Sequence, residues 1–528
     1  MDCRRRVQTI QPHFGQNRAM LLADVVAASE AVGATRSRKA KIAALAEALG
    51  TAGPDEVETA TSYLSGVLRQ RRTGLGWRGL TSLPEPAGAS TLTVNEVHDS
   101  FEAISRLSGS GSQGARGGLV AELFGRATEN EQRYLRNLVT GELRQGALDG
   151  LMLEAIAAAA DVSAALVRRA AMLCGATVPV AVAALTDGEP GLGRFGLEVG
   201  RPLRPMLAST APDVDAALEK MPDSAEFAVD RKLDGIRIQV HKSGDHITVY
   251  TRTLDEITDR LPEVVEAVRP LPVRDLVLDG EAIALDESGA PRPFQVTAAR
   301  TASKTDPAVA RTRTPVTTYF FDILHADGAD LIDEPARHRF DVLTTVLPAE
   351  LVVPRLVTGK DEEARQYFTD AVAAGHEGVV VKSLDAAYEA GRRGAAWVKV
   401  KPRHTLDLVV LAVEWGNGRR QGWLSNIHLG ARDPETGGFV MLGKTFKGMT
   451  DEMLAWQTER FLELESSRSS YVVQLRPEQV VEIAFDGIQS SSRYPGGMAL
   501  RFARVLRYRD DKTAAEADTV DTVRSLKG

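Results

Sequence analysis

Cysteine is scarce in this sequence, and long apolar runs are missing. Cys3 and Cys174 are the only cysteines among 528 residues, too few for a disulfide framework or a cysteine-based zinc site. No run reaches the roughly 18 to 20 apolar residues that cross a bilayer. The alanine-rich stretch 151–160 is short and bounded by charge, so it predicts a core helix. These absences exclude disulfide-stapled and membrane-spanning classes and favour a protein of the reducing cytoplasm.

An excess of positive charge is also missing. The formal net charge of −7 argues against a surface that binds nucleic acid over its whole area. Local basic faces stay possible, because charge acts within a Debye length of roughly 8 to 10 Å.

The first nineteen residues carry a basic cluster, Arg4 to Arg6, but lack the apolar core of a secretory signal. Met20 opens a more convincing helical sequence. We therefore expect residues 1–19 to be a disordered or mis-started extension.

The length and the changes of composition predict a multidomain chain, with about three domains. Ala, Leu and charged residues recur at spacings of three and four through residues 20–185, which predicts an all-α domain with a glycine- and serine-rich loop at 109–118. Residues 186–203 are rich in Gly and Pro and predict a linker. Mostly antiparallel strands with intervening helices predict an α+β domain at 204–402. Short strands with one helix predict a β-barrel of the OB-fold type at 403–528.

The stretch FAVDRKLDGIRIQVH, residues 227–241, alternates like a half-buried strand but is interrupted by Lys232, Asp234 and Gly235. A hairpin turn would explain the interruption, because Asp-Gly is common in such turns. A nucleophilic lysine held on a tight turn would explain it as well. The stretch alone leaves both interpretations open.

Charged residues recur at strand ends and turns through the α+β domain. They are Lys232, Asp234, Arg237, Arg252, Glu281, Asp322 beside Phe321, Glu377, Lys382, Arg393, Lys399 and Lys401. Singly, each has an ordinary structural explanation: Phe321 suits a core, and lysines two apart share one face of an edge strand. Together, several cations and two separate carboxylates favour a phosphate-and-metal site. The cations would neutralise a triphosphate, and the carboxylates would hold Mg²⁺.

Five segments of this domain resemble, in order, the motifs of the covalent nucleotidyltransferases. They are residues 230–237, 279–281, 319–322, 377–382 and 397–401, and the first contains the lysine-x-aspartate-glycine motif as KLDG. Within that superfamily the chain is most similar to the ATP-dependent DNA ligases of the three-domain actinobacterial type, over residues 20–528. Four residues alone would be a weak pattern, but the ordered set is specific.

The resemblance implies a role for each matching residue of the α+β domain. Lys232 would take AMP on its side-chain nitrogen, for which neighbouring cations, Mg²⁺ and desolvation must favour the unprotonated amine. Asp230 would contact the adenine amino group, at a position where the family usually has Glu. The other implied ATP contacts are Arg237 and Arg252 to ribose and phosphate, Phe321 stacked on the purine, Glu281 to ribose and metal, and Arg393, Lys399 and Lys401 to phosphates. Glu377 would be the second metal-associated acid.

Two further segments carry the resemblance outside that domain. Arg501, Arg504 and Lys512 would meet the leaving pyrophosphate when the barrel closes over ATP by a hinge near Arg403; Ala503 stands where the family usually has Pro. In the helical domain, Arg144 and Gly146 resemble the turn with which the family faces the DNA minor groove.

The resemblance implies an ATP-dependent DNA ligase that seals nicks in duplex DNA through a lysyl-AMP intermediate. It would use ATP as substrate and Mg²⁺ as cofactor, bind nicked double-stranded DNA as a monomer, and act in the cytoplasm on the nucleoid, in replication, repair or recombination. Two alternatives stay open: an RNA ligase or capping-type nucleotidyltransferase, and a non-catalytic clamp that binds nicks.

Overall fold

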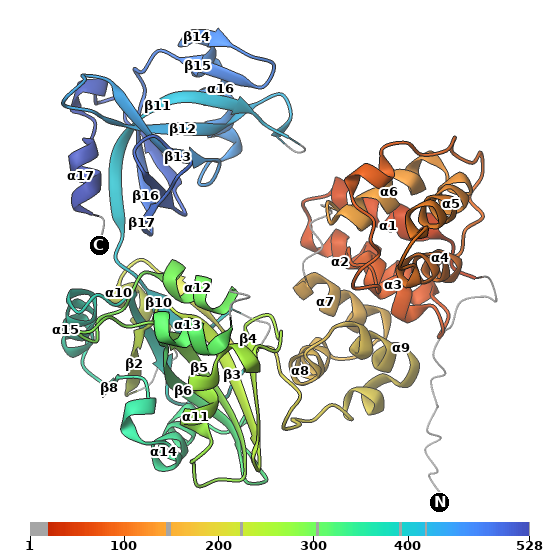
Figure 1. Ribbon diagram of the computed structural model, residues 1–528, viewed down its shortest axis with the longest axis horizontal. Helices are drawn as coiled ribbons and strands as arrows, with labels where there is room; N and C mark the ends of the chain where they lie inside the picture. The colour runs from red at the N-terminus through yellow and green to blue at the C-terminus, as the bar shows by residue number, and fades with distance from the viewer. Residues whose placement is uncertain are drawn as a thin grey trace, which may run out of the picture.

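The chain forms three bodies, and the middle body borders each of the other two (Figure 1). The computed structural model describes residues 19–143, 149–221, 225–302, 306–389, 393–417 and 420–526. The expected extension at 1–19 therefore lies outside the described residues, apart from Ala19. Among the described residues, no helix combines the length and the apolarity that crossing a bilayer requires.

The first body is helical, as predicted. Its helices are α1 (Leu22–Ala34), α2 (Arg38–Thr51), α3 (Val57–Leu64), α4 (Val94–Arg106), α5 (Ser112–Gly125), α6 (Glu129–Thr140), α7 (Asp149–Ala159), α8 (Ala164–Cys174) and α9 (Val178–Leu192), with a 3₁₀ turn at Trp77–Leu80. One apolar core runs through it, from Met20 to Leu192. Its helix boundaries follow capping chemistry: Thr93 and Thr128 each form a capping box at a helix start.

Two glycine-rich stretches of this body differ from expectation. The loop predicted at 109–118 is wrong for most of its length, because α5 begins at Ser112 and buries Val120, Leu123 and Phe124 in the core. Tertiary packing of that apolar face outweighs the low helix propensity of glycine. Helix α9 continues to Leu192, into the stretch predicted as a linker, and kinks at Gly188 with φ of 64°.

The second body contains two five-stranded sheets. The strands are β1 (Leu207–Ala211), β2 (Phe227–Lys232), β3 (Ile236–Ser243), β4 (His246–Thr251), β5 (Asp275–Ile283), β6 (Thr317–Ala326), β7 (Ala329–Asp330), β8 (Arg355–Thr358), β9 (Gly378–Ser383) and β10 (Arg393–Val400). The helices are α10 (Val214–Leu218), α11 (Pro262–Val268), α12 (Phe294–Ala302), α13 (Pro307–Arg313), α14 (Ala336–Val346) and α15 (Asp361–Ala373), with 3₁₀ turns at Thr258–Arg260 and Ala349–Leu351.

One sheet has the order β1-β10-β9-β2-β8 and the other β4-β3-β5-β6-β7. All their pairings are antiparallel except β1 with β10. Helix α15 packs on the first sheet through Ala364 and Ala371, and α11 packs on the second through Val264 and Val268. Strands β2 and β3 lie in different sheets, so the hairpin interpretation of the KLDG segment is wrong: the segment crosses between sheets.

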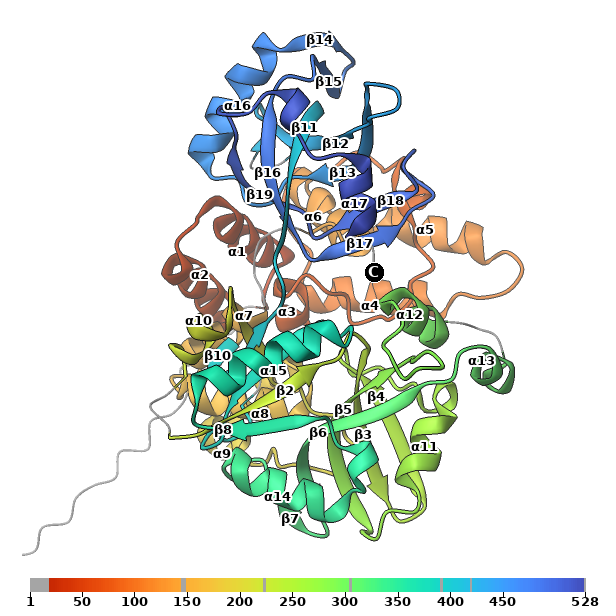
Figure 2. The ribbon, with the colours of Figure 1, turned by 90° about the vertical axis from the view of Figure 1, so that its left-hand side faces the viewer.

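The third body is rich in strands and follows a single crossing of the chain at the start of β11 (Figure 2). It contains β11 (His404–Trp415), β12 (Leu424–Arg432), β13 (Phe439–Thr445), α16 (Asp451–Glu463), β14 (Glu465–Arg468), β15 (Val472–Leu475), β16 (Val480–Phe485), β17 (Gly487–Ser490), β18 (Met498–Arg501), β19 (Arg504–Tyr508), a 3₁₀ turn at Ala514–Glu516 and α17 (Val520–Ser525). These elements agree with an OB-type domain.

The predicted OB-type barrel is not closed. Strand β11 pairs with β12 and also with both β15 and β16, and register shifts divide its length. The outer strands β13, β14 and β19 each have one partner among the described strands, while β17 and β18 pair only with each other. The sheet therefore stays open where a barrel would close.

The first and second bodies share an apolar core. It contains Met172 and Leu173 of α8, Leu203 and Met206 of the connecting segment, Val277 of β5, and Leu324, Ile332, Tyr388 and Trp397. An exposed ion pair between Arg169 and Asp333 borders it. The helical body is thus packed against the middle body through buried side chains, in addition to the chain segment that connects them.

Candidate active site

A cavity of about 650 Å³ lies between the two sheets of the middle body. Its walls include nine of the predicted site residues: Asp230, Lys232, Arg237, Arg252, Glu281, Phe321, Glu377, Lys399 and Lys401. They come from segments up to 171 positions apart, since the first is 230 and the last 401. The fold therefore brings the dispersed charges of the sequence to one place.

Strand pairing explains the central group. Lys232, the last residue of β2, pairs with Gly378 of β9, and the N–H of the preceding Glu377 donates to the Lys232 carbonyl oxygen at 3.2 Å. Strand β10 lies on the other side of β9 and ends one residue before Lys401. Three neighbouring strands thus deliver Lys232, Glu377 and Lys401 to one end of the sheet.

Gly235 lies where the chain passes from one sheet to the other, tightly packed against β5. A Cβ atom there would lie 2.3 Å from the Ala282 carbonyl oxygen and 2.9 Å from Glu281 Cγ. The Gly235 N–H instead donates to Glu281 Oε1 at 3.2 Å. Only glycine allows this approach, which places Glu281 directly behind the lysine-bearing segment.

Glu377 bridges two ammonium groups. Its two carboxylate oxygens accept from Lys232 Nζ and from Lys401 Nζ. Burial alone would raise the pKa of Glu377, but the two lysines outweigh it and hold the pKa below its usual value. Asp486 of the third body lies 3.4 Å from Lys401 Nζ. The amine of Lys232 therefore sits on the cavity wall inside an alternating row of positive and negative groups.

Glu281 is an acid of the cavity with a strongly raised pKa. Burial raises its pKa from 4.5 to about 7, repulsion by Glu377 adds to the rise, and Lys232 and Arg237 oppose it. The folded protein therefore holds this proton more tightly than the unfolded chain does. Glu281 contributes stability below pH about 4.5, and that contribution is lost as the pH rises through about 7.

We expect Glu281→Gln to flatten part of this pH dependence. Between about pH 5 and pH 8, the free energy of unfolding of the nucleotide-free variant should fall by roughly 2 kcal/mol less than that of the unaltered protein. Denaturant unfolding at both pH values measures the difference. Glu350→Gln, at an exposed position, is the control and should track the unaltered protein. Parallel curves for all three proteins would contradict the assignment.

The other end of the cavity is aromatic. Phe321 and Trp397 meet edge to face, with centroids 5.8 Å apart. The buried Lys382 Nζ lies 4.6 Å from the Phe321 centroid and 4.2 Å from that of Trp397. Such rings suit a planar base, and the adjoining lysines suit phosphates.

Asp230 lines this aromatic end but is already engaged. Arg355 donates to both of its oxygens, at 2.5 and 2.8 Å, and Lys382 Nζ lies 2.7 Å from Oδ2. Burial would raise the pKa of Asp230, but Arg355 and Lys382 outweigh it and lower the pKa. A base in the cavity would therefore meet a carboxylate held in one orientation.

The predicted residues of the third body are divided. Arg501 reaches the cavity edge, where its Nη1 lies 3.4 Å from Asp234 Oδ2. Arg504 is exposed on β19 and is not among the cavity-lining residues. Lys512 donates to Asp407 at 2.6 Å. In this arrangement of the bodies, Arg501 alone of the three stands beside the KLDG segment.

Three predicted positions cannot be placed fully. Arg144 and Gly146 lie outside the described residues. Arg393 begins β10, but its side chain lies outside the described part of the chain.

The structure adds residues to which the sequence assigned no role. Arg355, Trp397, Asp486 and the aromatic rings of Phe294 and Phe502 stand at or beside the cavity. Trp397 had a usable signal, because it alternates with Lys399 and Lys401 on one strand face. Arg355 had none, since its partner Asp230 lies 125 positions away.

Metal-binding capacity is limited to pairs of acids. Across the described ranges, no group of three or more His, Cys, Asp or Glu side chains forms a ready-made metal site. Glu281 and Glu377 line the same cavity and repel each other. Two carboxylates beside bound phosphate and water match what Mg²⁺ accepts, so the donor set fits that ion.

Comparison with known proteins covers all three bodies. The sequence model described as "ATP dependent DNA ligase domain" matches residues 205–401, "ATP dependent DNA ligase C terminal region" matches 420–512, and "DNA ligase N terminus" matches 80–157. A "Probable DNA ligase" of Nocardioides sp. is 66% identical over 517 residues, covering 97% of this chain and all of the relative. One of Beutenbergia cavernae is 64% identical, covering 96% of this chain and all of the relative. The solved structure named Pmar-Lig_PreS3 has a TM-score of 0.61 at 17% identity, covers 92% of this chain and 99% of its own, and speaks for the fold alone.

Proposed function

This chain belongs to the ATP-dependent DNA ligases, and from that premise we propose which of its residues carry the reaction. Members of the family act on nicked DNA and use ATP as substrate, and roles in repair and replication are typical of them. The observation that carries the proposal is the row Lys232–Glu377–Lys401 on the wall of a cavity with an aromatic and a cationic end.

Lys232 is the nucleophile of the first step. Its Nζ attacks the α-phosphorus of ATP, a P–N bond forms, the bond to the bridging oxygen breaks, and pyrophosphate leaves. Glu377 accepts hydrogen bonds from both lysines, so it orients Lys232 and is placed to relay the proton that the amine must lose. AMP then passes to the 5′-phosphate at the nick, and the 3′-hydroxyl displaces AMP.

The nucleotide lies with its base at the aromatic end. Phe321 stacks on the purine, Asp230 receives the adenine amino group, and Arg237 and Arg252 contact ribose and phosphate. Lys399, Lys401 and Arg393 hold the phosphates, and Lys401 assists attack at the α-phosphate by opposing the charge that develops there.

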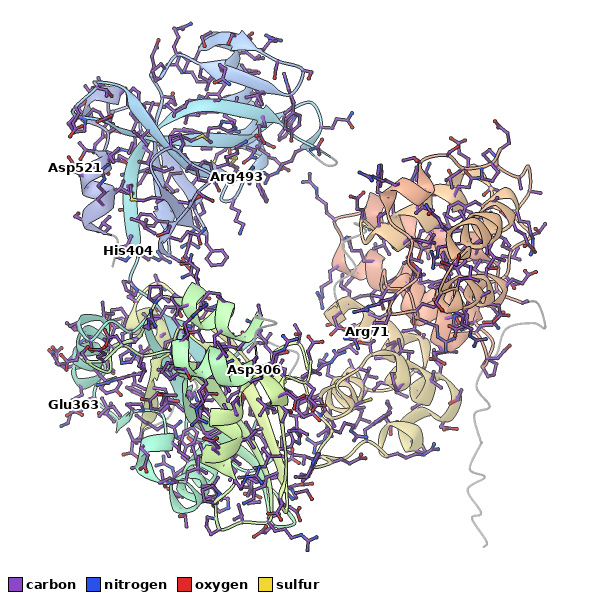
Figure 3. All side chains as sticks on the ribbon, in the orientation of Figure 1. Arg71, Asp306, Glu363, His404, Arg493 and Asp521 are labelled. Atoms are coloured by element: carbon purple, nitrogen blue, oxygen red, sulfur yellow. The ribbon has the colours of Figure 1, made fainter. Side chains whose placement is uncertain are left out.

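Closure of the third body completes the pyrophosphate site. Arg501 already faces Asp234, whereas Arg504 and Lys512 would reach the phosphates only after the body turns about the hinge near Arg403. His404, next to that hinge, lies at the junction of the two bodies (Figure 3). The triphosphate would replace Asp407 as the partner of Lys512.

Glu281 and Glu377 are the residues we propose for Mg²⁺. Bound Mg²⁺ supplies positive charge against the phosphate oxygens. Glu281 must lose its proton to serve as a ligand, so its raised pKa makes affinity rise with pH through about 7.

DNA contacts and the remaining assignments extend the same proposal. Arg144 and Gly146 face the minor groove of the nicked duplex, and the protein works as a monomer in the cytoplasm, on the nucleoid. The domains divide as 20–185 for DNA binding, 186–203 as linker, 204–402 for adenylation and 403–528 for the OB-type domain.

A sealing assay tests the function directly. A nicked DNA duplex should be joined with ATP and not with GTP, because Asp230 and the aromatic end of the cavity select adenine. It should not be joined with NAD, because the chain belongs to the ATP-dependent family. A nicked RNA duplex should be joined at least about tenfold more slowly, given a helical body built for B-form DNA. Equal sealing of both duplexes would favour the RNA ligase alternative, and binding without sealing would favour the clamp.

A further inference from the structure

Tyr388 lies outside every role assigned above, yet it connects two parts of the nucleotide site. It is 1% exposed and sits between β9 and β10. Its hydroxyl donates to Asp279 Oδ2 at 2.7 Å and accepts from the Met206 N–H at 2.9 Å. Tyr388 also meets the cavity residue Trp397 edge to face, at 5.9 Å.

The same two partners hold Arg237. Arg237 Nε and Nη2 donate to the two oxygens of Asp279 at 2.9 and 2.6 Å, and Nη1 donates to the Met206 carbonyl oxygen at 2.6 Å. The hydrogen bonds thus form a closed ring: Tyr388 to Asp279, Asp279 to Arg237, Arg237 to Met206, and Met206 back to Tyr388.

Met206 belongs to the segment that connects the helical body to the middle body, so this segment is part of the ring of hydrogen bonds. It is the last residue before β1, and Arg204 two positions earlier donates its N–H to the carbonyl oxygen of Met172 in α8 at 2.9 Å. Met206 and Met172 also share the apolar core between the first two bodies. The segment that joins those bodies therefore supplies a backbone carbonyl to a cavity-lining arginine.

We infer that Tyr388 is a positioning residue: through Asp279 and Met206 it holds Arg237 in the orientation that binds the nucleotide, so that the interdomain segment is part of the nucleotide site. This inference rests on the proposed role of Arg237. A buried polar network with every member satisfied is rigid, and Arg237 then presents one fixed guanidinium to ribose and phosphate. Without the hydroxyl, the Met206 N–H loses its acceptor and Asp279 keeps only Arg237, so the ring opens.

The test is Tyr388→Phe in the full chain, which keeps the ring and removes the hydroxyl. Protein freed of bound AMP with pyrophosphate is given α-labelled ATP, and the initial rate of Lys232 labelling is followed against ATP concentration. We expect the KM for ATP to rise about tenfold with kcat changed less than about threefold, because a ground-state contact is weakened. A KM within twofold of the unaltered protein would overturn the inference.

Tyr63→Phe is the matched control. Tyr63 is equally buried, in the helical body, and its hydroxyl has no hydrogen-bond partner among the described residues. A purely structural loss would lower the unfolding midpoint and the labelled fraction in either variant without changing the KM for ATP. That outcome in Tyr388→Phe would contradict the positioning role of Tyr388.

Asp279→Asn keeps the test open if Tyr388→Phe does not fold. It weakens the same ring from its acidic member, and the KM for ATP should again rise; an unchanged KM would overturn the inference. If the unaltered protein shows no Lys232-dependent labelling at all, the proposed function fails, independently of what Tyr388 does.

Discussion

Lys232→Ala should carry no covalent AMP. Labelling by α-labelled ATP is expected to fall at least about a thousandfold, because Lys401, the other amine that we place at the α-phosphate, opposes charge there and is not the nucleophile. Removal of a nucleophile typically costs that much or more. Intact mass and gel labelling of the purified protein measure this. Lys401 shares the carboxylate of Glu377 with Lys232, and Asp486 lies beside it as well.

Lys232→Arg is the sharper companion variant. It keeps a positive charge beside Glu377 but offers a guanidinium that stays protonated and cannot form the phosphoramide bond. It should therefore be as inactive in labelling as Lys232→Ala while unfolding at a midpoint closer to that of the unaltered protein.

Both variants should still seal a nick that already carries AMP on its 5′-phosphate. The last step forms a bond between the 3′-oxygen and phosphorus and needs no amine. Persistent covalent AMP in Lys232→Ala would remove the basis of the mechanism. Loss of sealing on the pre-adenylated nick in both variants would show instead that position 232 acts in more than the first two steps.

Asp322→Ala should cause the largest loss of stability. Asp322 and Arg339 have no exposed side-chain surface, and Arg339 Nε and Nη2 donate to the two carboxylate oxygens at 2.7 and 3.0 Å. Removing the acid leaves a buried guanidinium without its counter-charge, which costs about 3 to 5 kcal/mol of unfolding free energy. Denaturant unfolding of the full chain, followed through the transition of the middle body, gives the value.

The chain offers an exposed counterpart as control. Asp333 likewise accepts two hydrogen bonds, from Arg169 Nη1 and Nη2 at 2.5 and 2.6 Å, but the side chains of Asp333 and Arg169 are 61% and 44% exposed. Asp333→Ala should cost less than about 1 kcal/mol. Similar losses for both variants would mean that burial does not decide the strength of these pairs.

Alternation along one strand predicts part of the cavity lining. The spacing of Lys399 and Lys401 predicts one shared strand face, and both line the cavity, Lys399 within β10 and Lys401 just after its end. The KLDG segment left two interpretations open, because over four residues a hairpin turn within one sheet has the same sequence pattern as a crossing between two sheets. Only the pairing of β2 and β3 with different neighbours decided it.

The counter-ions were not foreseen, for a different reason. Asp230 and Arg355 lie 125 positions apart, Asp279 and Tyr388 lie 109 apart, and Lys232 and Glu377 lie 145 apart. Hydrogen bonding between such residues depends on strand register and on loop paths, and neither leaves a local pattern. The prediction for α5 was wrong for another reason. Its glycines predicted a loop, but burial of Val120, Leu123 and Phe124 in the core stabilises a helix there.

By itself, the order of residues determined that this chain has helical and strand-rich parts, that five short segments stand in the order of the nucleotidyltransferase motifs, and that Lys232 is the nucleophile to test. Those properties are local, because they depend on period, spacing and residue type. Only the tertiary structure decided which carboxylate pairs with which Lys or Arg side chain. It also decided that the sheet of the third body stays open and that Tyr388 and Arg237 contact the same two residues, Asp279 and Met206. Those properties depend on the distances between segments far apart in the chain, which only the folded backbone sets.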